Sequence, residues 1–381
     1  GTVGRSYYVS QSKLTEDGLQ IVAKCLAQDG KRTVDRIVEI SQSGRAPKND
    51  PAIAALAMAA SATDVKTRQY AFSKLESVCR IGTHLFQFAE VINELRGWGR
   101  TLTSGIRNWY LQKPVDKLAY QAIKYQQRDG WSHRDLLRLA HPRTKDVDRN
   151  ALFAWMTHET APETFPDSLS ILEGFLKAQQ ETDVKKILPL IDRYHLSREM
   201  IPTEFLSKPE VWEAMLYSMG LTAVIRNLAN MTRIGLLTDH SETTKKVIAR
   251  ITDTAQLQKA RIHPVNVLIG TMTYQAGHGV RGTNTWTPVG KIIAGLNDAF
   301  YASFGFVPST GKNFLLGVDV SGSMTMSMVA GVPNMSPRTA AAAMAMTTLR
   351  TEPNHTILGF STGIIPLKLH ARMSLEEVER Y

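Results

Sequence analysis

The sequence changes character within residues 308–323, PSTGKNFLLGVDVSGS. Residues 313–319 inside this stretch form a short apolar run between polar residues, which is typical of a buried strand. A helix is expected from Ser336 to Leu349, and a second strand over residues 355–360. A strand, a helix and a strand at this spacing predict a βαβ unit with a parallel sheet. The sequence therefore predicts an α/β region that begins near residue 308.

Upstream of this stretch the pattern is helical. From about Thr15 to Ser303, apolar residues recur mostly three or four positions apart, in segments of helix length with short breaks between them. Successive amphipathic helices on short connections are typical of an α-solenoid of HEAT or armadillo type. The repeats have no fixed period, so a non-repetitive helical bundle is the alternative. The predicted chain is mainly α, with a helical-repeat domain over residues 1–307 and a partial α/β domain over residues 308–381.

The composition limits the class of protein. The chain has 381 residues, a formal charge of +10 and a pI near 9.5, which favours a polyanionic partner but also contributes to solubility. Cys25 and Cys79 have no metal-ligand spacing around them, so neither a disulfide framework nor a zinc site is expected. The longest apolar stretches are far below the ~20 residues that cross a bilayer, so no membrane partner is expected. These observations favour a cytoplasmic protein.

Positive charge is concentrated in one part of the helical region. Residues 96–145 contain eleven Lys or Arg against three Asp, a net charge of +8. Residues 146–183 reverse the balance, with eight acidic residues against two basic ones, a net charge of −6. We therefore expect an electropositive surface beside an electronegative one.

Spacing inside the basic segment suggests two cationic helix faces. Lys124 and Arg128 are four residues apart, and a second set has spacings of i, i+4 and i+7. The members of that second set are Arg134, Arg138 and His141. Two such faces that meet at a bend can hold phosphates from two directions, because cations release counterions from RNA. The alternative is an ordinary solvated face.

The bend is predicted at Gly130-Trp131-Ser132. Ser132 has the character of an N-cap for the helix that follows. Trp131 is either a core residue or a platform on which a nucleobase stacks, and the residue type favours the core.

A possible cation site follows the first predicted strand. Asp319, Ser321 and Ser323 place one carboxylate and two hydroxyls on the loop that leaves the carboxyl end of a parallel strand. This pattern is the first loop of a metal-ion-dependent adhesion site and suits a divalent cation, with Mg²⁺ preferred. Such a site also draws a Thr and an Asp from later loops, which we expect beyond Tyr381. The site is therefore expected to be incomplete in this chain.

Six segments of the chain resemble one family. They are VCRIGTHLF at 78–86, WGRTL at 98–102, KYQQRDGWSHRDLLRLAHP at 124–142, ARIHP at 260–264, GHGVRG at 277–282 and TGKNFLLGVDVSGSM at 310–324. In this order they resemble the Ro ribonucleoprotein autoantigen and its bacterial relatives, which carry the TROVE module. Gly82 departs from the pattern, because a Pro is expected there.

The resemblance implies a closed ring of HEAT-like helical repeats that carries a von Willebrand factor type A (vWA) domain. It implies that small structured Y RNAs bind the outer basic surface through Lys124, Arg128 and His141. The charge pattern adds Arg134 and Arg138 as expected RNA contacts. The resemblance also implies that single-stranded 3′ ends of misfolded non-coding RNA enter a central hole. The residues expected to line that hole are Arg100, Arg261, His263 and Arg281. From the residues alone, a structural role is favoured for His263.

Three functions follow from these observations. The first is a non-catalytic RNA-binding scaffold in RNA quality control, which in bacterial relatives tethers the exoribonuclease polynucleotide phosphorylase through the Y RNA. The second is a metal-dependent protein-binding module that acts through the vWA domain. The third, an enzyme that acts on RNA, is disfavoured because the sequence has no persuasive catalytic constellation.

Overall fold

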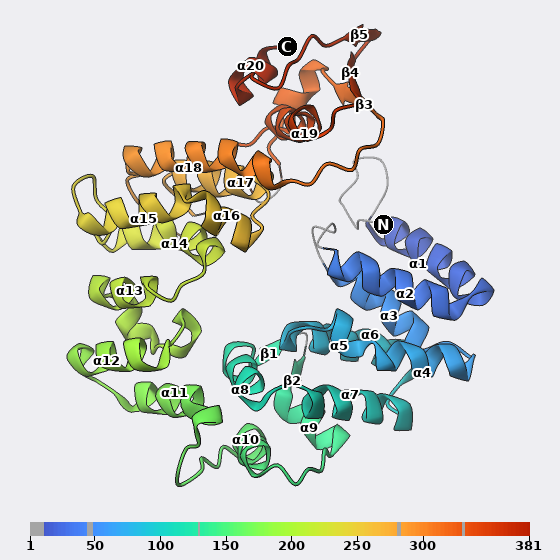
Figure 1. The fold of residues 1–381 in the computed structure, drawn as a ribbon, viewed down its shortest axis with the longest axis vertical. Coiled ribbons are helices and arrows are strands. Elements are labelled where there is room, and N and C mark those ends of the chain that lie inside the picture. Colours follow the sequence, from blue (N-terminus) through green and yellow to red (C-terminus); the bar gives the residue numbers. More distant parts are fainter. Residues whose placement is uncertain (1–10, 44–48, 129, 280–282, 330–331) are drawn as a thin grey trace. The chain divides into compact units, whose positions relative to one another are not determined.

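The computed structural model describes residues 11–43, 49–128, 130–279, 283–329 and 332–381, with side chains from residue 19 onward (Figure 1). These residues form two compact units. The first reaches Glu181 and includes Glu199–Ile201, and the second contains Thr182–Arg198 and Pro202–Tyr381.

The first unit is a succession of helices on short connections. Its helices are α1 (Gln11–Gln28), α2 (Gly30–Gln42), α3 (Asp50–Ala60), α4 (Val65–Ser73), α5 (Leu75–Val78), α6 (Gly82–Arg96), α7 (Arg100–Gln112), α8 (Val115–Lys124), α9 (His133–Ala140), α10 (Val147–His158) and α11 (Ser170–Gln180). Between α8 and α9 lies a two-stranded antiparallel ladder of β1 (Gln127–Arg128) and β2 (Trp131–Ser132). The sequence pattern did not indicate these two strands.

Local chemistry explains where several of these helices begin. The side chains of Asp29, Asp64 and Asp146 each accept a backbone N–H from the first turn that follows. This bond satisfies a donor that the helix itself leaves unpaired. Ser132 does the same for α9, as the sequence predicted, and it also forms a capping box with Asp135.

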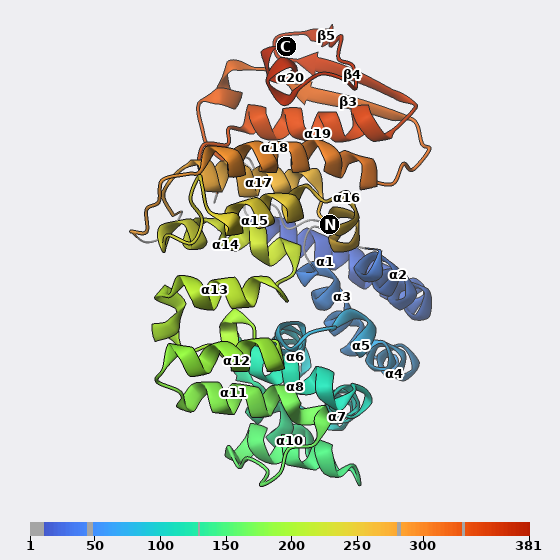
Figure 2. The ribbon, with the colours of Figure 1, turned by 60° about the vertical axis from the view of Figure 1, so that its left-hand side comes forward.

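The second unit continues with helices and ends in the small sheet. Its elements are α12 (Val184–Tyr194), α13 (Pro209–Leu216), α14 (Leu221–Arg233), α15 (Glu242–Thr252), α16 (Thr254–Ala260), α17 (Pro264–Gln275), α18 (Gly290–Ser303), β3 (Phe314–Asp319), α19 (Pro337–Thr351), β4 (His355–Phe360), β5 (Ile364–Pro366) and α20 (Leu375–Arg380). Within this unit, Figure 2 shows α17, α18, α19 and the sheet in successive layers. The backbone N–H of Leu375 donates to the Tyr301 hydroxyl at 3.0 Å, which ties the α/β region to α18.

The predicted βαβ unit is confirmed. Strands β3 and β4 are parallel, and Phe314 pairs with His355 and Asp319 with Phe360. Strand β5 pairs antiparallel with β4 and was not predicted, because three residues are too short to show a pattern. The fold class is thus confirmed as mainly helical with a small α/β region, while the closed ring and the domain boundary near residue 308 stay predictions.

Only one face of the sheet is covered among the described residues. Ala345 and Leu349 of α19 pack on Ile357 of β4, together with Leu316 and Val318. The side chains that alternate with these point to the opposite face. On that face Leu315, Phe360 and Ile364 are exposed by 71, 43 and 73%.

Candidate nucleic-acid interface

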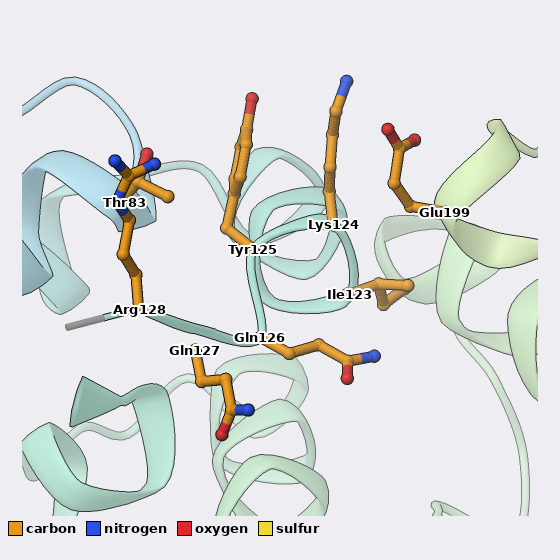
Figure 3. Close-up of a pocket in the computed structure, with 8 residues that line it drawn as sticks. All are labelled: Thr83, Ile123, Lys124, Tyr125, Gln126, Gln127, Arg128 and Glu199. Atoms are coloured by element: carbon orange, nitrogen blue, oxygen red, sulfur yellow. The ribbon is translucent and has the colours of Figure 1, made fainter. Parts of the chain in front are cut away.

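The most basic segment of the chain folds into a pocket in the first unit. Its volume is about 390 Å³, and it is lined by Thr83, Ile123, Lys124, Tyr125, Gln126, Gln127, Arg128 and Glu199. Figure 3 shows the Lys124 and Tyr125 side chains extending side by side in the same direction. The pocket therefore presents an ammonium, a phenol and a guanidinium together.

The prediction that Lys124 and Arg128 share a helix face is wrong. Helix α8 ends at Lys124, since Tyr125 leaves the helical region with φ −121° and ψ 69°, and Arg128 lies in β1. The Asp129-Gly130 dipeptide is a hairpin signal, and Gly130 has φ +79°, which glycine adopts without strain. The hairpin nevertheless brings both cations to one pocket.

Neighbouring tyrosines orient the ammonium group of Lys124 and favour its charged form. Its Nζ donates to the Tyr120 hydroxyl at 3.0 Å and lies 5.2 Å and 5.7 Å from the ring centroids of Tyr120 and Tyr125. Partial burial lowers the pKa of Lys124, but the Tyr120 hydrogen bond and the nearby tyrosines and Glu199 outweigh it, so the pKa is raised. Lys124 is therefore a cation at neutral pH, and its tyrosine contacts orient it.

The second cationic set lies together at α9. Arg134 pairs with Glu159, and Arg138 donates to the Thr157 carbonyl at 3.5 Å, so both reach toward the C-terminal end of α10. His141 caps α9 with φ 44°, so it has left the helix face that its spacing predicted, and it is exposed. These three side chains do not line the pocket around Lys124.

Two residues that line the pocket, Tyr125 and Glu199, were not among the predicted site residues. Tyr125 stands between the two predicted cations, where an aromatic residue beside a phosphate-binding cation is a usable signal. Glu199 lies in a short 3-10 turn at Arg198–Met200, more than seventy residues away along the chain, and only folding brings it to the pocket.

A buried histidine, His133, directly follows the hairpin as the first residue of α9. His133 is 4% exposed, its Nδ1 lies 2.7 Å from the Tyr110 hydroxyl, and its ring packs edge-on against Phe86 at 4.7 Å between centroids. A side chain at Gly82 would place its Cβ 2.8 Å from the Nε2 of His133. In this structure a Cβ at position 82, including that of the Pro expected there, would therefore require His133 to shift.

Burial makes the stability of the fold depend on pH through His133. Burial lowers its pKa to about 3, so the ring is neutral in the folded chain and takes up a proton mainly on unfolding. The free energy of unfolding is therefore highest above the ordinary histidine pKa and falls as the pH drops below it, by about 2 kcal/mol between pH 7 and pH 5 for this one group. Urea unfolding at several pH values measures this slope. His133→Gln should flatten it, whereas an unchanged slope would assign the effect to other groups.

The residues expected to hold single-stranded RNA fall in both units. Arg100 is the exposed first residue of α7 in the first unit, and Arg261 is the exposed left-handed cap of α16 in the second, with φ 49°. His263 caps α17, where its Nδ1 accepts the Val265 N–H at 3.2 Å, and burial lowers its pKa. This is the structural role that the residue type favoured. Arg281 lies outside the described residues.

The predicted cation loop has the expected position. Asp319 ends β3, and its Oδ1 accepts the Ser321 N–H at 2.9 Å, while the Ser321 and Ser323 hydroxyl oxygens are 2.9 Å apart. The bonds from Ser321 lower the pKa of Asp319, so the carboxylate is charged at neutral pH. One carboxylate and two hydroxyls are hard oxygen donors that fit a divalent cation but supply a single charge.

Two features are absent from the described part of the chain. It contains no group of three or more His, Cys, Asp or Glu side chains arranged to hold a metal ion. Over the same residues, no helix is both long and apolar enough to cross a membrane.

The fold and site together define a helical protein with a basic pocket and a vWA-type strand loop. The family model of the TROVE domain matches residues 4–194 and 191–272, and that of the Ro60 vWA domain matches residues 313–381. The chain therefore belongs to the Ro family of TROVE proteins, as its sequence motifs predicted.

Individual relatives agree with this assignment. The RNA-binding protein RO60 of Deinococcus radiodurans is 40% identical over 378 residues, which cover 99% of this chain and 71% of that protein. The protein of the same name from Caenorhabditis elegans is 30% identical, covering 99% of this chain and 70% of its own length. The crystal structure of the Deinococcus radiodurans RO (RSR) protein matches with a TM-score of 0.84 and 38% identity, covering 100% of this chain and 74% of that one.

Proposed function

We propose that this chain is a non-catalytic RNA-binding protein that holds a small structured non-coding RNA, of the Y RNA class, on its basic hairpin. The observation that carries the proposal is the pocket in which Lys124, Tyr125 and Arg128 converge. The two cations attract phosphates and release their counterions, while the phenol ring offers a surface for a ribose or base. The relatives are named RNA-binding proteins, which supports RNA as the ligand.

The exposed cations at α9 extend the proposed interface. Arg138 and His141 are exposed, and Arg134 is shared with Glu159, so an approaching phosphate competes with one acidic partner there. Surface ion pairs contribute little to stability, about 0–1 kcal/mol, so this competition costs little. We expect Lys124 and Arg128 to contribute more to binding than Arg134, because they line one pocket together.

The proposal includes a second mode, in which the helical region takes single-stranded 3′ ends of misfolded RNA. Arg100, Arg261, His263 and Arg281 are the proposed contacts, and the resemblance to the Ro family is the main support. Such a protein acts in RNA quality control as a scaffold, and an exoribonuclease such as polynucleotide phosphorylase is the proposed protein partner. The chain itself contributes binding and no bond cleavage.

The second mode predicts a requirement for an unpaired tail. An RNA duplex with a single-stranded 3′ extension should bind more tightly than a blunt duplex of equal length, because a flexible strand exposes bases and closely spaced phosphates that a rigid helix does not. Competition in a filter-binding assay measures the difference. Equal competition by the blunt duplex would rule out the second mode. Intact RNA after prolonged incubation with the purified chain is the expected control result, and cleavage would favour an enzyme.

A second candidate function rests on the loop at Asp319. We propose that this loop binds a divalent cation, with Asp319, Ser321 and Ser323 as ligands. When bound, such an ion would offer a coordination position to an acidic group of a protein partner. A partner bound in this way would be lost on chelation and retained at high salt, whereas the RNA proposed here would be lost at high salt and retained on chelation.

Cation binding by this chain is expected to be weak. A single carboxylate compensates little of the charge of Mg²⁺, which also gives up its waters reluctantly. Titration calorimetry should therefore show Mg²⁺ binding in roughly the millimolar range, and Asp319→Asn should remove it. Tight binding, or binding that survives Asp319→Asn, would contradict the assignment of the ligands. RNA affinity should be the same with and without a chelator.

A further inference from the structure

Two tryptophans stack on each other beside the basic hairpin. The rings of Trp98 and Trp131 lie 5.6 Å apart between centroids, with 22° between their planes. Both side chains are half-buried, whereas Trp109 and Trp212 of the core are 1% and 0% exposed. The pair therefore lies at the edge of the core, with part of its surface within reach of solvent.

The two rings are held differently. The indole N–H of Trp131 donates to a carboxylate oxygen of Glu90 on α6 at 2.6 Å, which fixes the ring on the helix below it. The indole N–H of Trp98 is buried without an acceptor among the described residues, so stacking is what orients that ring. The pair thus consists of one ring fixed by a hydrogen bond and one ring held by stacking.

Three arginines are neighbours of this pair in the ladder or along the chain. Arg128 lies directly opposite Trp131 in the β1–β2 ladder, so the two side chains leave the same face of the hairpin. Arg96 and Arg100 stand two residues before and after Trp98, and both are exposed. Guanidinium groups at these positions can contact the phosphates on either side of a stacked base.

The backbone around both rings is open. Gly97 and Gly99 flank Trp98, Gly130 precedes Trp131, and at all three glycines a Cβ would meet nothing within 4 Å. An RNA strand can therefore approach both rings without displacing a side chain at these positions.

We infer that Trp98 and Trp131 form a stacking platform for one unpaired nucleobase, with Arg128 on the adjoining phosphate. The ligand class is a single-stranded segment of RNA, such as a loop or bulge of the structured RNA held at Lys124. This inference rests on the proposed RNA-binding function and adds to it a contact that depends on the base. Stacking on an aromatic side chain tolerates any base, because every base has a π-face, so the platform selects unpaired RNA without selecting sequence.

The test compares two probes on the full 381-residue chain. One is a fluorescent oligouridylate of about eight nucleotides, and the other has the same phosphates with abasic sites in place of the bases. The unchanged chain should bind the oligouridylate about 5- to 100-fold more tightly, and Trp98→Leu should remove that preference while leaving the affinity for the abasic probe and its salt dependence unchanged. Trp98→Phe should retain most of the preference, because the π-face remains.

The results of this experiment test the stacking platform and the proposed RNA-binding function independently. Salt-dependent binding of structured RNA with no preference for bases in the unchanged chain would overturn the platform and leave the proposed function standing. Failure to bind either probe or structured RNA would overturn both. If Trp98→Leu does not fold, photo-crosslinking of a 5-iodouridine probe to the unchanged chain decides the question. Crosslinks at Trp98 or Trp131 would support the platform, and crosslinks only elsewhere would overturn it.

Discussion

Replacing Lys124 and Arg128 together by Ala is expected to weaken binding of structured RNA on the order of 10- to 100-fold at 0.1 M salt, and to lower the slope of log K against log salt by about 1–2. Each phosphate contact contributes ~0.7–0.9 to that slope, because the cation releases about one counterion from the RNA. Both side chains line one pocket, so both are expected to contact the same stretch of backbone. Fluorescence anisotropy over a series of salt concentrations measures affinity and slope together.

The matched control is the double variant Lys117→Ala and Lys145→Ala. Both lysines are exposed and belong to the same basic segment, so the net charge changes equally, but neither lines the pocket. The control should change the affinity by much less than the pocket variant. An equal effect of the two double variants would mean that the net positive charge of the segment, and not the pocket, determines the affinity for RNA. An unchanged slope in the pocket variant would remove Lys124 and Arg128 from the interface.

The second large effect concerns stability. Gly82→Ala should lower the free energy of unfolding by about 1–3 kcal/mol, because the new Cβ would lie 2.8 Å from His133 Nε2 and 3.3 Å from Tyr125 Cβ. His133 cannot move aside cheaply, since it is buried among aromatic rings and bonded to Tyr110. Urea unfolding followed by circular dichroism measures the loss.

A glycine in a similar setting provides the control. Gly290 is the first residue of α18, as Gly82 is of α6, and both follow a β-branched apolar cap residue without a side-chain cap bond. A Cβ at Gly290 would meet nothing within 4 Å, so Gly290→Ala should be neutral or stabilise by up to about 1 kcal/mol. In a His133→Ala background the cost of Gly82→Ala should fall to the smaller part that the Tyr125 contact causes, because the two sites are coupled. A cost that persists there in full would mean that His133 is not its cause.

The sequence was most informative where one periodic pattern extended over a whole element. The βαβ unit was predictable because β3 and β4 are apolar runs between polar residues and α19 begins at the Ser336 cap. The end of α8 was not predictable from spacing, since Lys124 and Arg128 satisfy a helical period equally well. Turn chemistry at Asp129-Gly130 prevailed over that period.

The candidate site was predictable in part. The two pocket cations were identified from charge and resemblance, but their shared location comes from the hairpin. Glu199 and the contact between Gly82 and His133 depend on segments distant in the sequence, and no local pattern encodes them. The stacking of Trp98 on Trp131 is of the same kind, because each tryptophan by itself resembles a core residue.

The face of the sheet that no described residue covers has a consequence for preparing residues 1–381. Leu315 and Ile364 are exposed on the two outer strands, and β3 has an unpaired edge among the described residues. Exposed apolar strands with free backbone donors and acceptors are templates for edge-to-edge aggregation. In a preparation of residues 1–381 alone, this face and this edge are therefore the expected site of self-association.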